Sequence, residues 1–463
     1  MVHFGTAGIR GSVVNHVTPA VALAVGQAVG RLATEQADTH ERSTPEIVIG
    51  RDGRTSGPAL AAAAEAGVSS VGGVPVRIGA VPTPTLAFAS RGRHGLMLTA
   101  SHNPPTDNGI KCFVDGSEFD RQRETTVEQY VDEEAPPDDW TEWQSSTQAD
   151  LLPRYRETVV DYSRAFGADC AGARIAVDCG TGMAARATPQ VLRELGATAI
   201  AVNATVDGHF PARPSKPTPE TLSEFRTLLA DGDFRFGIAH DGDADRIVIV
   251  DSDGEVVHED TILAILAGHY TRQYVEQHGE DAPTPVVVTT PNASGRIDEQ
   301  VTDAGGRIER VQLGGLHEGI AAVEADDQPV VFAAEPWKHI HPRLGGWIDG
   351  IASAAVLSRL VADEGLASLR EPITERPYRK VSVDCPDAAK SAAMSRLETT
   401  LPEQFPEAAV SLDHGVRLRF PDDSWLLVRP SGTEPYIRLY VESDDVDAVV
   451  QKAVGVIETV VDA

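Results

Sequence analysis

Lysine, cysteine, aromatic residues and long apolar runs are all scarce in this sequence of 463 residues. Acidic residues number 69 against 40 basic ones, for a formal charge of -29, and only six of the basic residues are lysines. A charge of this sign repels nucleic-acid phosphates and anionic lipids, so we expect neither a nucleic acid nor a membrane as partner. Abundant acid with so little lysine also predicts a halophile-like surface of solvated carboxylates.

The four cysteines show no C-x-x-C spacing, and each lies beside an apolar run that is typical of a strand. This pattern favours buried free thiols over disulfides or zinc ligands. The N-terminal MVHFGTAGIRG lacks the basic and apolar segments of a signal peptide, and no apolar run approaches membrane-spanning length. We therefore expect a cytoplasmic protein. The cysteines are Cys112, Cys170, Cys179 and Cys385.

One pattern occurs three times: a short β-branched run, then a loop rich in glycine, aspartate or threonine, then a helix-like segment. Its instances are IVIGRDGR at residues 47–54, RIAVDCGTG at 174–182 and VVVTTPNASG at 286–295. Alternation of this kind predicts α/β units around mixed or mostly parallel sheets. Three unrelated strands are the alternative interpretation.

The end of the chain has a different pattern. Residues 425–428 and 436–441 are strand-like, and the apolar residues of the segment that follows have helical spacing, which predicts a small C-terminal α+β domain. The proline- and acid-rich DEEAPPDDW at 132–140 and the turn DSDGE at 251–255 indicate further boundaries. We expect four domains, at residues 1–148, 149–253, 254–369 and 370–463.

The strongest local motif is HDGDADR at residues 240–246, after one short apolar run and before another. Asp241, Asp243 and Asp245 alternate, so their carboxylates can converge on a hard cation such as Mg²⁺. An EF-hand is excluded because Arg246 stands where the loop needs glycine, and Ser252 where it needs glutamate. A solvated acidic turn is the remaining alternative.

Three glycine-containing loops are ambiguous by themselves. RPSGTEP at 429–435 offers an arginine, hydroxyls and backbone N–H groups for an anion, but an ordinary hairpin has the same composition. GTAGIRG at 5–11 either brings Arg10 to an anion or makes a tight turn. GTGMAA at 180–185 is a weak dinucleotide motif, since the next strand-like run ends at Asn203 where an acidic residue is expected.

The stretch LTASHNPPTDNGIK at residues 98–111 places a serine at the end of an apolar run and a lysine ten residues later. No catalytic triad can be argued for Ser101. A phosphorylated Ser101 would need a cation, which the three aspartates can supply, and a base, which a lysine with a lowered pKa can supply. Taken alone, Lys111 is expected to be a surface lysine.

Together these motifs resemble the α-D-phosphohexomutase superfamily of phosphoglucomutases, phosphomannomutases and phosphoglucosamine mutases. The matching elements follow one another over nearly the whole chain: FGTAGIRG, GRDGRTSG, VPTPT, TASHNPP with NGIK, DGDADR, a glutamate-bearing sugar loop and RPSGTEP. The resemblance implies a heart-shaped arrangement of three related α/β domains with mixed sheets and a smaller C-terminal α+β domain.

The resemblance also implies a role for each matching residue. Ser101 would be the phosphoserine and would share Mg²⁺ with the three aspartates, and Lys111 would be the general acid/base. The remaining members of the site are implied in the same way: catalytic His102, Arg10 and Arg246; sugar-binding Glu335, Trp337 and His339; and phosphate-binding Arg429, Ser431, Gly432 and Thr433.

Two loops depart from the family pattern. The sugar loop, usually G-E-x-S-G-H, reads AEPWKH here, so that Trp337 replaces the serine and Lys338 the glycine. Glu335 can still accept hydrogen bonds from sugar hydroxyls, and Trp337 can stack on a sugar or fill a core. In LGGLHEG at 313–319, Gly315 stands where many members carry a charge.

The sequence therefore predicts a phosphohexomutase that moves phosphate between O6 and O1 of an aldohexose phosphate, through phosphoserine and a 1,6-bisphosphate that also serves as activator. Glucose and mannose phosphates are favoured, with glucosamine phosphate next. A metal-dependent sugar phosphatase and a non-catalytic sugar-phosphate sensor are the alternatives. We expect a monomer or a homodimer.

Overall fold

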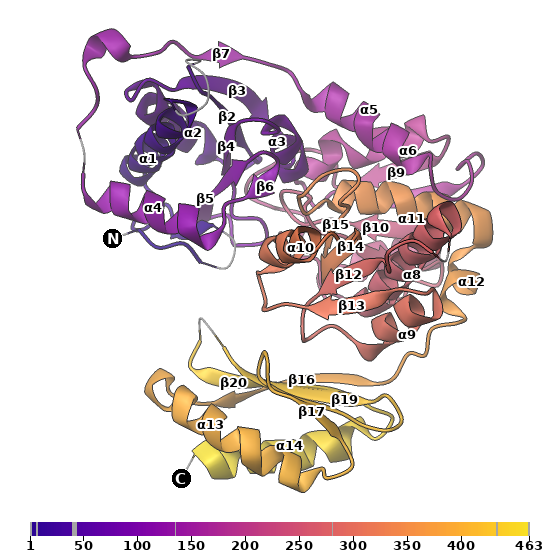
Figure 1. Cartoon of the computed structure of the whole chain (residues 1–463). Helices are drawn as coiled ribbons and strands as arrows, with labels where there is room; N and C mark the ends of the chain where they lie inside the picture. The colour runs from indigo at the N-terminus through magenta and orange to yellow at the C-terminus, as the bar shows by residue number, and fades with distance from the viewer. Residues whose placement is uncertain are drawn as a thin grey trace. The chain divides into compact units, whose positions relative to one another are not determined.

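The computed structural model describes residues 2–5, 8–38, 44–134, 136–279, 281–431 and 434–461. The chain forms two compact units, each of which contains two separate stretches of sequence. Unit 1 comprises Met1–Ile262 and Val331–Arg370, and unit 2 comprises Leu263–Val330 and Glu371–Ala463. Figure 1 labels the elements of both units.

The first sheet of unit 1 has the order β1-β5-β4-β2-β3-β7, with β6 paired to β5. β2 is parallel to β3 and β4, whereas β4 and β5 are antiparallel, so the sheet is mixed. Its strands are β1 (Ile9–Ser12), β2 (Glu46–Arg51), β3 (Val74–Ala80), β4 (His94–Leu98), β5 (Asp107–Val114), β6 (Ser117–Glu118) and β7 (Thr147–Gln148). The accompanying helices are α1 (Pro19–Asp38), α2 (Gly57–Ser69), α3 (Thr83–Ala89) and α4 (Arg121–Asp132).

Helices α1 and α2 lie side by side in Figure 1, and glycines make this close packing possible. A Cβ on Gly26 of α1 would lie 2.2 Å from the carbonyl oxygen of Ala64, and one on Gly67 of α2 would lie 2.2 Å from that of Leu23. A larger residue at either position would push the helices apart. Buried aliphatic side chains of both helices and of the strands form the core beneath them.

The second sheet of unit 1 has the order β11-β10-β8-β9 and is also mixed, because β10 is parallel to β8 and antiparallel to β11. Its strands are β8 (Arg174–Asp178), β9 (Thr198–Val202), β10 (Phe236–Ala239) and β11 (Val248–Val250). The helical segments are η1 (Trp140–Glu142), α5 (Leu152–Ser163), η2 (Met183–Arg186), α6 (Thr188–Glu194) and α7 (Ser223–Ala230). The antiparallel pair β14 (Val330–Glu335) and β15 (Lys338–Ile340) is followed by α11 (Gly350–Glu364) and α12 (Leu366–Arg370).

Unit 2 joins a parallel strand pair to a five-stranded antiparallel sheet of order β16-β20-β19-β18-β17. The first part contains α8 (Glu259–His278), whose first turn belongs to unit 1, and β12 (Val286–Thr289), α9 (Gly295–Asp303), β13 (Arg307–Arg310) and α10 (Leu316–Ala325). The antiparallel part contains β16 (Tyr378–Asp384), α13 (Asp387–Gln404), β17 (Ala409–Ser411), β18 (Val416–Arg419), β19 (Trp425–Pro430), β20 (Tyr436–Glu442) and α14 (Val446–Val461). Helices α13 and α14 lie side by side on one face of this sheet (Figure 1).

Unit 2 contains a fully buried ion pair. Arg296 at the start of α9 donates from Nη2 to Oε1 of Glu442 on β20 at 2.9 Å. The indole N–H of Trp425 on β19 donates to Oε2 of the same carboxylate at 3.0 Å. Because all three side chains are almost completely buried, these bonds hold α9 on the antiparallel sheet, and loss of one partner would leave an uncompensated polar group.

The predicted α/β class is confirmed, with mixed α/β sheets and a C-terminal antiparallel sheet. Each of the three repeated motifs is a strand, a loop and a helical segment, beginning at β2, β8 and β12, and the four cysteines are buried and free. The boundaries of the four predicted domains stay a prediction. In the part of the chain that the structure describes, no helix has the length and apolarity that crossing a membrane requires.

Candidate active site

Three aspartates converge in the loop between β10 and β11. Asp241, Asp243 and Asp245 are at most 2% exposed, and one ligand oxygen from each lies within 4.8 Å of the others. Gly242 permits the tight packing of this loop, because a Cβ there would lie 2.8 Å from the carbonyl oxygen of Ser101. The alternating motif thus forms a buried carboxylate cluster rather than a solvated acidic turn.

The contacts of the cluster leave oxygens available for a cation. Thr83 donates to Oδ2 of Asp243 at 2.6 Å, and Lys111 donates to Oδ2 of Asp245 at 2.6 Å. Among the described residues, neither Oδ1 of Asp243 nor Oδ1 of Asp245 has a hydrogen-bond partner, although both atoms are buried. Carboxylate oxygens that are desolvated and unsatisfied fit a hard divalent cation such as Mg²⁺.

Electrostatics within the cluster support this interpretation. Burial, together with the charges of Asp245 and Asp243, raises the pKa of Asp241 to about 8. Burial also opposes ionisation of Asp245, but Lys111 and Arg246 outweigh it and hold the pKa of that carboxyl well below its ordinary value. The buried carboxylates of Asp241 and Asp245 therefore need added positive charge to ionise together, and a bound divalent cation would supply it.

Ser101 lies directly against this cluster. Its Oγ donates to Oδ2 of Asp241 at 2.6 Å and lies 3.3 Å from Nδ1 of His102. Ser101 is completely buried and has a left-handed backbone with φ of +50°, which costs a non-glycine residue free energy. Burial and the charges of Arg246 and Arg10 lower the pKa of His102 to about 2, so its imidazole is neutral.

A buried arginine holds the backbone of the Ser101 loop. Arg54 donates from Nη2 to the carbonyl oxygens of Ser101 at 2.9 Å and Asn103 at 2.8 Å. Its Nη1 donates to the carbonyls of Pro104 and Asp107, and its Nε to Oδ2 of Asp52. With no exposed surface, this guanidinium satisfies four loop carbonyls at once, and it thereby offsets the strain of the Ser101 backbone.

Lys111 on β5 is a buried residue of the same site. It is 2% exposed and lies 3.7 Å from carboxylate oxygens of Asp243 and Glu118, in addition to its bond to Asp245. Burial by itself would lower the pKa of Lys111, but the three carboxylates outweigh burial and raise it above the ordinary value. The expectation of a lysine with a lowered pKa is therefore wrong, and so is the alternative of a surface lysine.

The two arginines predicted for this site come from different elements. Arg10 on β1 is in register with Gly109 of β5. Its charge helps to lower the pKa of His102 and partly opposes the rise in the pKa of Lys111. Nε of Arg246 lies 3.8 Å from carboxylate oxygens of Asp241 and Asp245. Unit 1 thus brings together all the residues predicted to surround the transferring phosphoryl group.

The AEPWKH loop lies against the aspartate loop. Lys338 makes an isolated backbone bridge with Arg246, and the carbonyl of Trp337 accepts from the N–H of Ile247 at 3.4 Å. Glu335 and Trp337 are half-buried, and Trp337 has a φ of +69°. His339 is 1% exposed and its Nδ1 lies 2.9 Å from Ser353 Oγ, so its imidazole is in the core; its role in sugar binding stays a prediction.

The RPSGTEP loop belongs to unit 2 and joins β19 to β20. Arg429 donates from Nη2 to the hydroxyl of Tyr440 at 3.0 Å, and Ser431 is buried. Lys390 on α13 donates to the carbonyl of Ser431 at 2.7 Å and to that of Glu434. Gly432 and Thr433 lie outside the described residues, so phosphate binding by this loop stays a prediction.

Comparison with known families identifies the chain. The models for phosphoglucomutase/phosphomannomutase alpha/beta/alpha domain I, domain II and the C-terminal domain match residues 1–138, 154–254 and 381–458. This chain belongs to the phosphoglucomutase/phosphomannomutase family. The family is part of the α-D-phosphohexomutase superfamily, so the protein is an enzyme, a phosphosugar mutase of the isomerase class.

Two relatives show similarity over almost the whole mutase. A phosphopentomutase of Thermococcus kodakarensis is 38% identical over 449 residues, with 95% of this chain and 93% of the relative covered. A probable phosphoglucosamine mutase of Methanopyrus kandleri is 38% identical over 452 residues, covering 96% and 94%. A Burkholderia thailandensis family protein of known structure has the same fold, with a TM-score of 0.83, 22% identity and coverage of 98% and 97%.

Some residues that build the mutase site were not assigned from the sequence. Arg54, Asp52 and Thr83 lie in the quoted motifs GRDGRTSG and VPTPT, but their roles depend on contacts with loops far along the chain. Ser215 is another, because its Oγ donates to the carbonyl of Ser101 at 2.7 Å. The one sequence signal that could have indicated their roles is the charged pair Asp52 and Arg54 directly after a strand, which the structure shows to be buried.

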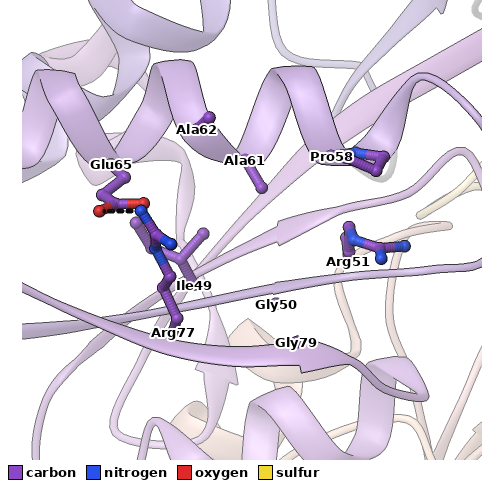
Figure 2. A pocket seen from close by; sticks show the side chains of 9 residues that line it. All are labelled: Ile49, Gly50, Arg51, Pro58, Ala61, Ala62, Glu65, Arg77 and Gly79. Carbon is purple, nitrogen blue, oxygen red and sulfur yellow. Dashed lines mark hydrogen bonds and ion pairs between the residues drawn. The ribbon is translucent and has the colours of Figure 1, made fainter. Parts of the chain in front are cut away.

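The pocket in Figure 2 lies elsewhere in unit 1 and does not contain the aspartate cluster. It has a volume of about 210 Å³ and is lined by α2, β2 and β3. The ion pair between Glu65 and Arg77 lies on its wall, and Arg51 donates to the carbonyl of Asp52. Nothing in this pocket resembles the combination of serine, aspartates and lysine at the mutase site.

Proposed function

We propose that this chain is a Mg²⁺-dependent mutase that transfers a phosphoryl group between the terminal and anomeric oxygens of an aldose phosphate, through phosphorylated Ser101 and a sugar bisphosphate. The observation that carries the proposal is the hydrogen bond of 2.6 Å between Ser101 Oγ and Asp241, in a cluster with two unsatisfied carboxylate oxygens. A phosphoryl group on that Oγ stands beside the metal ligands.

Different residues of unit 1 have different roles in the phosphoryl transfer. The three aspartates would hold Mg²⁺, which supplies charge neutralisation when bound. In the first transfer the bond from phosphorus to Ser101 Oγ breaks as the bond to a sugar oxygen forms, and the proton of the sugar hydroxyl passes to Ser101 Oγ. In the second transfer the other phosphoryl group of the bisphosphate moves to Ser101 Oγ, and the proton returns to the sugar oxygen that this group leaves. Lys111, protonated against Asp245, is suited to give a proton to the departing oxygen and to regain it from the incoming hydroxyl.

Other residues, charged and neutral, position the phosphate and the sugar in this proposal. Arg10, Arg246 and neutral His102 surround the reacting phosphoryl group. Glu335, Trp337 and His339 belong to the sugar loop, and Arg429, Ser431, Gly432 and Thr433 bind the phosphate that is not reacting. Preorganised positive charge around a phosphoryl group accounts for a large share of catalysis in such transfers.

The sugar is the open part of the proposal. The sequence motifs favour glucose and mannose phosphates, through a 1,6-bisphosphate, with glucosamine phosphate next. The relatives add a pentose phosphate, since one is a phosphopentomutase, and support glucosamine phosphate. The substrate panel must therefore contain ribose 5-phosphate beside the 6-phosphates of glucose, mannose and glucosamine.

One experiment tests the function. Purified protein is given each sugar phosphate with Mg²⁺ and the matching bisphosphate, while 1-phosphate formation and phosphorylation of Ser101 are followed by NMR and mass spectrometry. We expect isomerisation without release of free phosphate, and a loss of several orders of magnitude in Ser101→Ala. Ser145→Ala, at an exposed serine of unit 1, is the matched control and should retain full turnover. Free phosphate without 1-phosphate would contradict the mutase.

We also propose the environment and the oligomeric state of the enzyme. The charge of -29 and the six lysines support a halophilic cytoplasmic enzyme, and the chain would act as a monomer or a homodimer. Sedimentation at several salt concentrations distinguishes the two oligomeric states.

A further inference from the structure

Two of the six lysines of the chain flank one tryptophan beside the active site. Nζ of Lys216 lies 5.9 Å from the ring centroid of Trp337, and Lys338 is the next residue in the chain. Lysine is so scarce in this sequence that two such residues, one near a half-buried ring and one beside it in the chain, require an explanation.

Lys338 is linked to the catalytic loop through its backbone, which bridges to Arg246. Its Nζ lies 3.3 Å from Oε2 of Glu335, and both side chains are about seven-eighths buried, at 14% and 13% exposed. Glu335, the carboxylate of this loop, is therefore already neutralised by a cation of the same loop.

Lys216 reaches the same region from a different segment. It follows Ser215, whose hydroxyl donates to the carbonyl of Ser101, so its backbone is fixed beside the phosphoserine loop. Lys216 thus adds one positive charge to those of Arg10, Lys111 and Arg246, whereas Lys338 forms a neutral pair with Glu335.

We infer that Lys216, Trp337 and Lys338 form a cationic aromatic subsite that accepts a neutral sugar phosphate and rejects a 2-amino sugar phosphate. This inference rests on the proposed function and names its substrate class. The tryptophan ring offers a face for the C–H surface of a sugar. The two ammonium groups can donate to sugar hydroxyls and to phosphate oxygens, and neither can accept a hydrogen bond from an ammonium group.

The charges of the sugar loop account for the expected preference for a neutral sugar phosphate over a 2-amino sugar phosphate. Glucosamine phosphate differs from glucose phosphate in a group at C2 that carries a positive charge when protonated. A site with an unpaired carboxylate would attract that group, but Glu335 is paired with Lys338, and Lys216 adds repulsion. Like charges a few ångströms apart in a partly desolvated site are strongly unfavourable, so specificity arises from repulsion as much as from attraction.

Substitution of Lys338 tests the inference directly. The kcat/KM values of wild type, Lys338→Met, Lys338→Arg and Lys216→Met are measured with glucosamine 6-phosphate, glucose 6-phosphate and ribose 5-phosphate. We expect wild type to prefer the neutral sugars. Lys338→Met should raise the ratio of glucosamine to glucose phosphate about tenfold, because it leaves the Glu335 carboxylate unpaired and able to attract the ammonium group. Lys216→Met should raise it less, and Lys338→Arg should retain the wild-type ratio.

The matched control is Lys452→Met on α14 of unit 2, which removes the same charge at an amine that donates to the carbonyl of Gln404 and lies over the ring of Phe405. Its ratio should equal that of wild type. A wild-type preference for glucosamine phosphate, or an unchanged ratio in folded Lys338→Met, would overturn the inference while leaving the mutase intact. Absence of turnover on every sugar would instead overturn the proposed function. In that case calorimetry measures binding of the same sugar phosphates to the wild-type protein. Equal Kd values for glucosamine 6-phosphate and glucose 6-phosphate would refute the inference.

Discussion

Arg54 and Ser101 are joined by a hydrogen bond of 2.9 Å from the guanidinium Nη2 to the serine carbonyl oxygen, and both residues are completely buried. The same guanidinium binds three further carbonyls of the loop, at Asn103, Pro104 and Asp107. Since Ser101 has a left-handed backbone, its loop needs such external bonds to hold one conformation. Arg54 is therefore a positioning residue for the nucleophile.

Arg54→Lys should lower kcat about 100-fold, because a lysine keeps the charge but cannot bind four carbonyls in a planar fork. The fraction of Ser101 that is phosphorylated and the steady-state kcat are the measurements. Arg164→Lys, at an exposed arginine paired with Asp161 on α5, is the control and should leave kcat unchanged. If Arg54→Lys folds and turns over at the wild-type rate, the positioning role is wrong.

Asp243→Asn should separate metal binding from folding. When a chelator removes metal ions, the variant should be at least as stable as wild type, because one carboxylate is removed from a crowded cluster. Added Mg²⁺ should raise the Tm of wild type but not of the variant, and turnover should fall by several orders of magnitude. Differential scanning fluorimetry with and without Mg²⁺ measures both effects. Asp231→Asn, at an exposed residue, should respond to Mg²⁺ like wild type, and an equal response in Asp243→Asn would refute the metal site.

Buried histidines should make the protein sensitive to acid. His339 and His341 share the hydroxyl of Ser353, and burial lowers the pKa of each from 6.5 to about 3. Between these pH values the unfolded chain binds protons that the folded protein does not, so the free energy of unfolding falls as pH falls below 6.5. Each such group contributes about 1.4 kcal/mol per pH unit.

The measurement is urea denaturation between pH 7 and pH 4 at constant ionic strength. His341→Gln should lower the pH dependence of the unfolding free energy by about one proton, whatever its effect on absolute stability. His209→Gln, at a histidine whose side chain is 73% exposed, should keep the wild-type slope. An unchanged slope in His341→Gln would show that His341 is protonated in the folded state.

Salt should stabilise the protein and support its activity. At a formal charge of -29 the acidic side chains repel one another, and salt screens this repulsion over distances of about 10 Å at 0.1 M ionic strength. Dilution to low ionic strength should therefore lower both Tm and kcat. Equal values at low and high salt would remove the support for a halophilic surface.

The sequence allowed correct prediction of those parts of the fold and site that depend on local pattern. The strand, loop and helix repeats at β2, β8 and β12 have short-range periodicity, and the alternation of Asp241, Asp243 and Asp245 indicates convergent oxygens within one loop. The strands β19 and β20 and helix α14 were predicted for the same reason. Each of these features is specified by residues that are near one another in the chain.

The protonation of Lys111 and the roles of Arg54 and Lys338 could not be predicted in this way. Lys111 lies among carboxylates that are 7, 132 and 134 residues away in the chain, and whether burial or these charges determines its pKa depends on distances of 2.6 to 3.7 Å. Local sequence by itself determined which chemical groups are present and on which loops. Tertiary structure decided which of them share a desolvated site, because Coulomb interactions and hydrogen bonds depend on separation in space rather than in sequence.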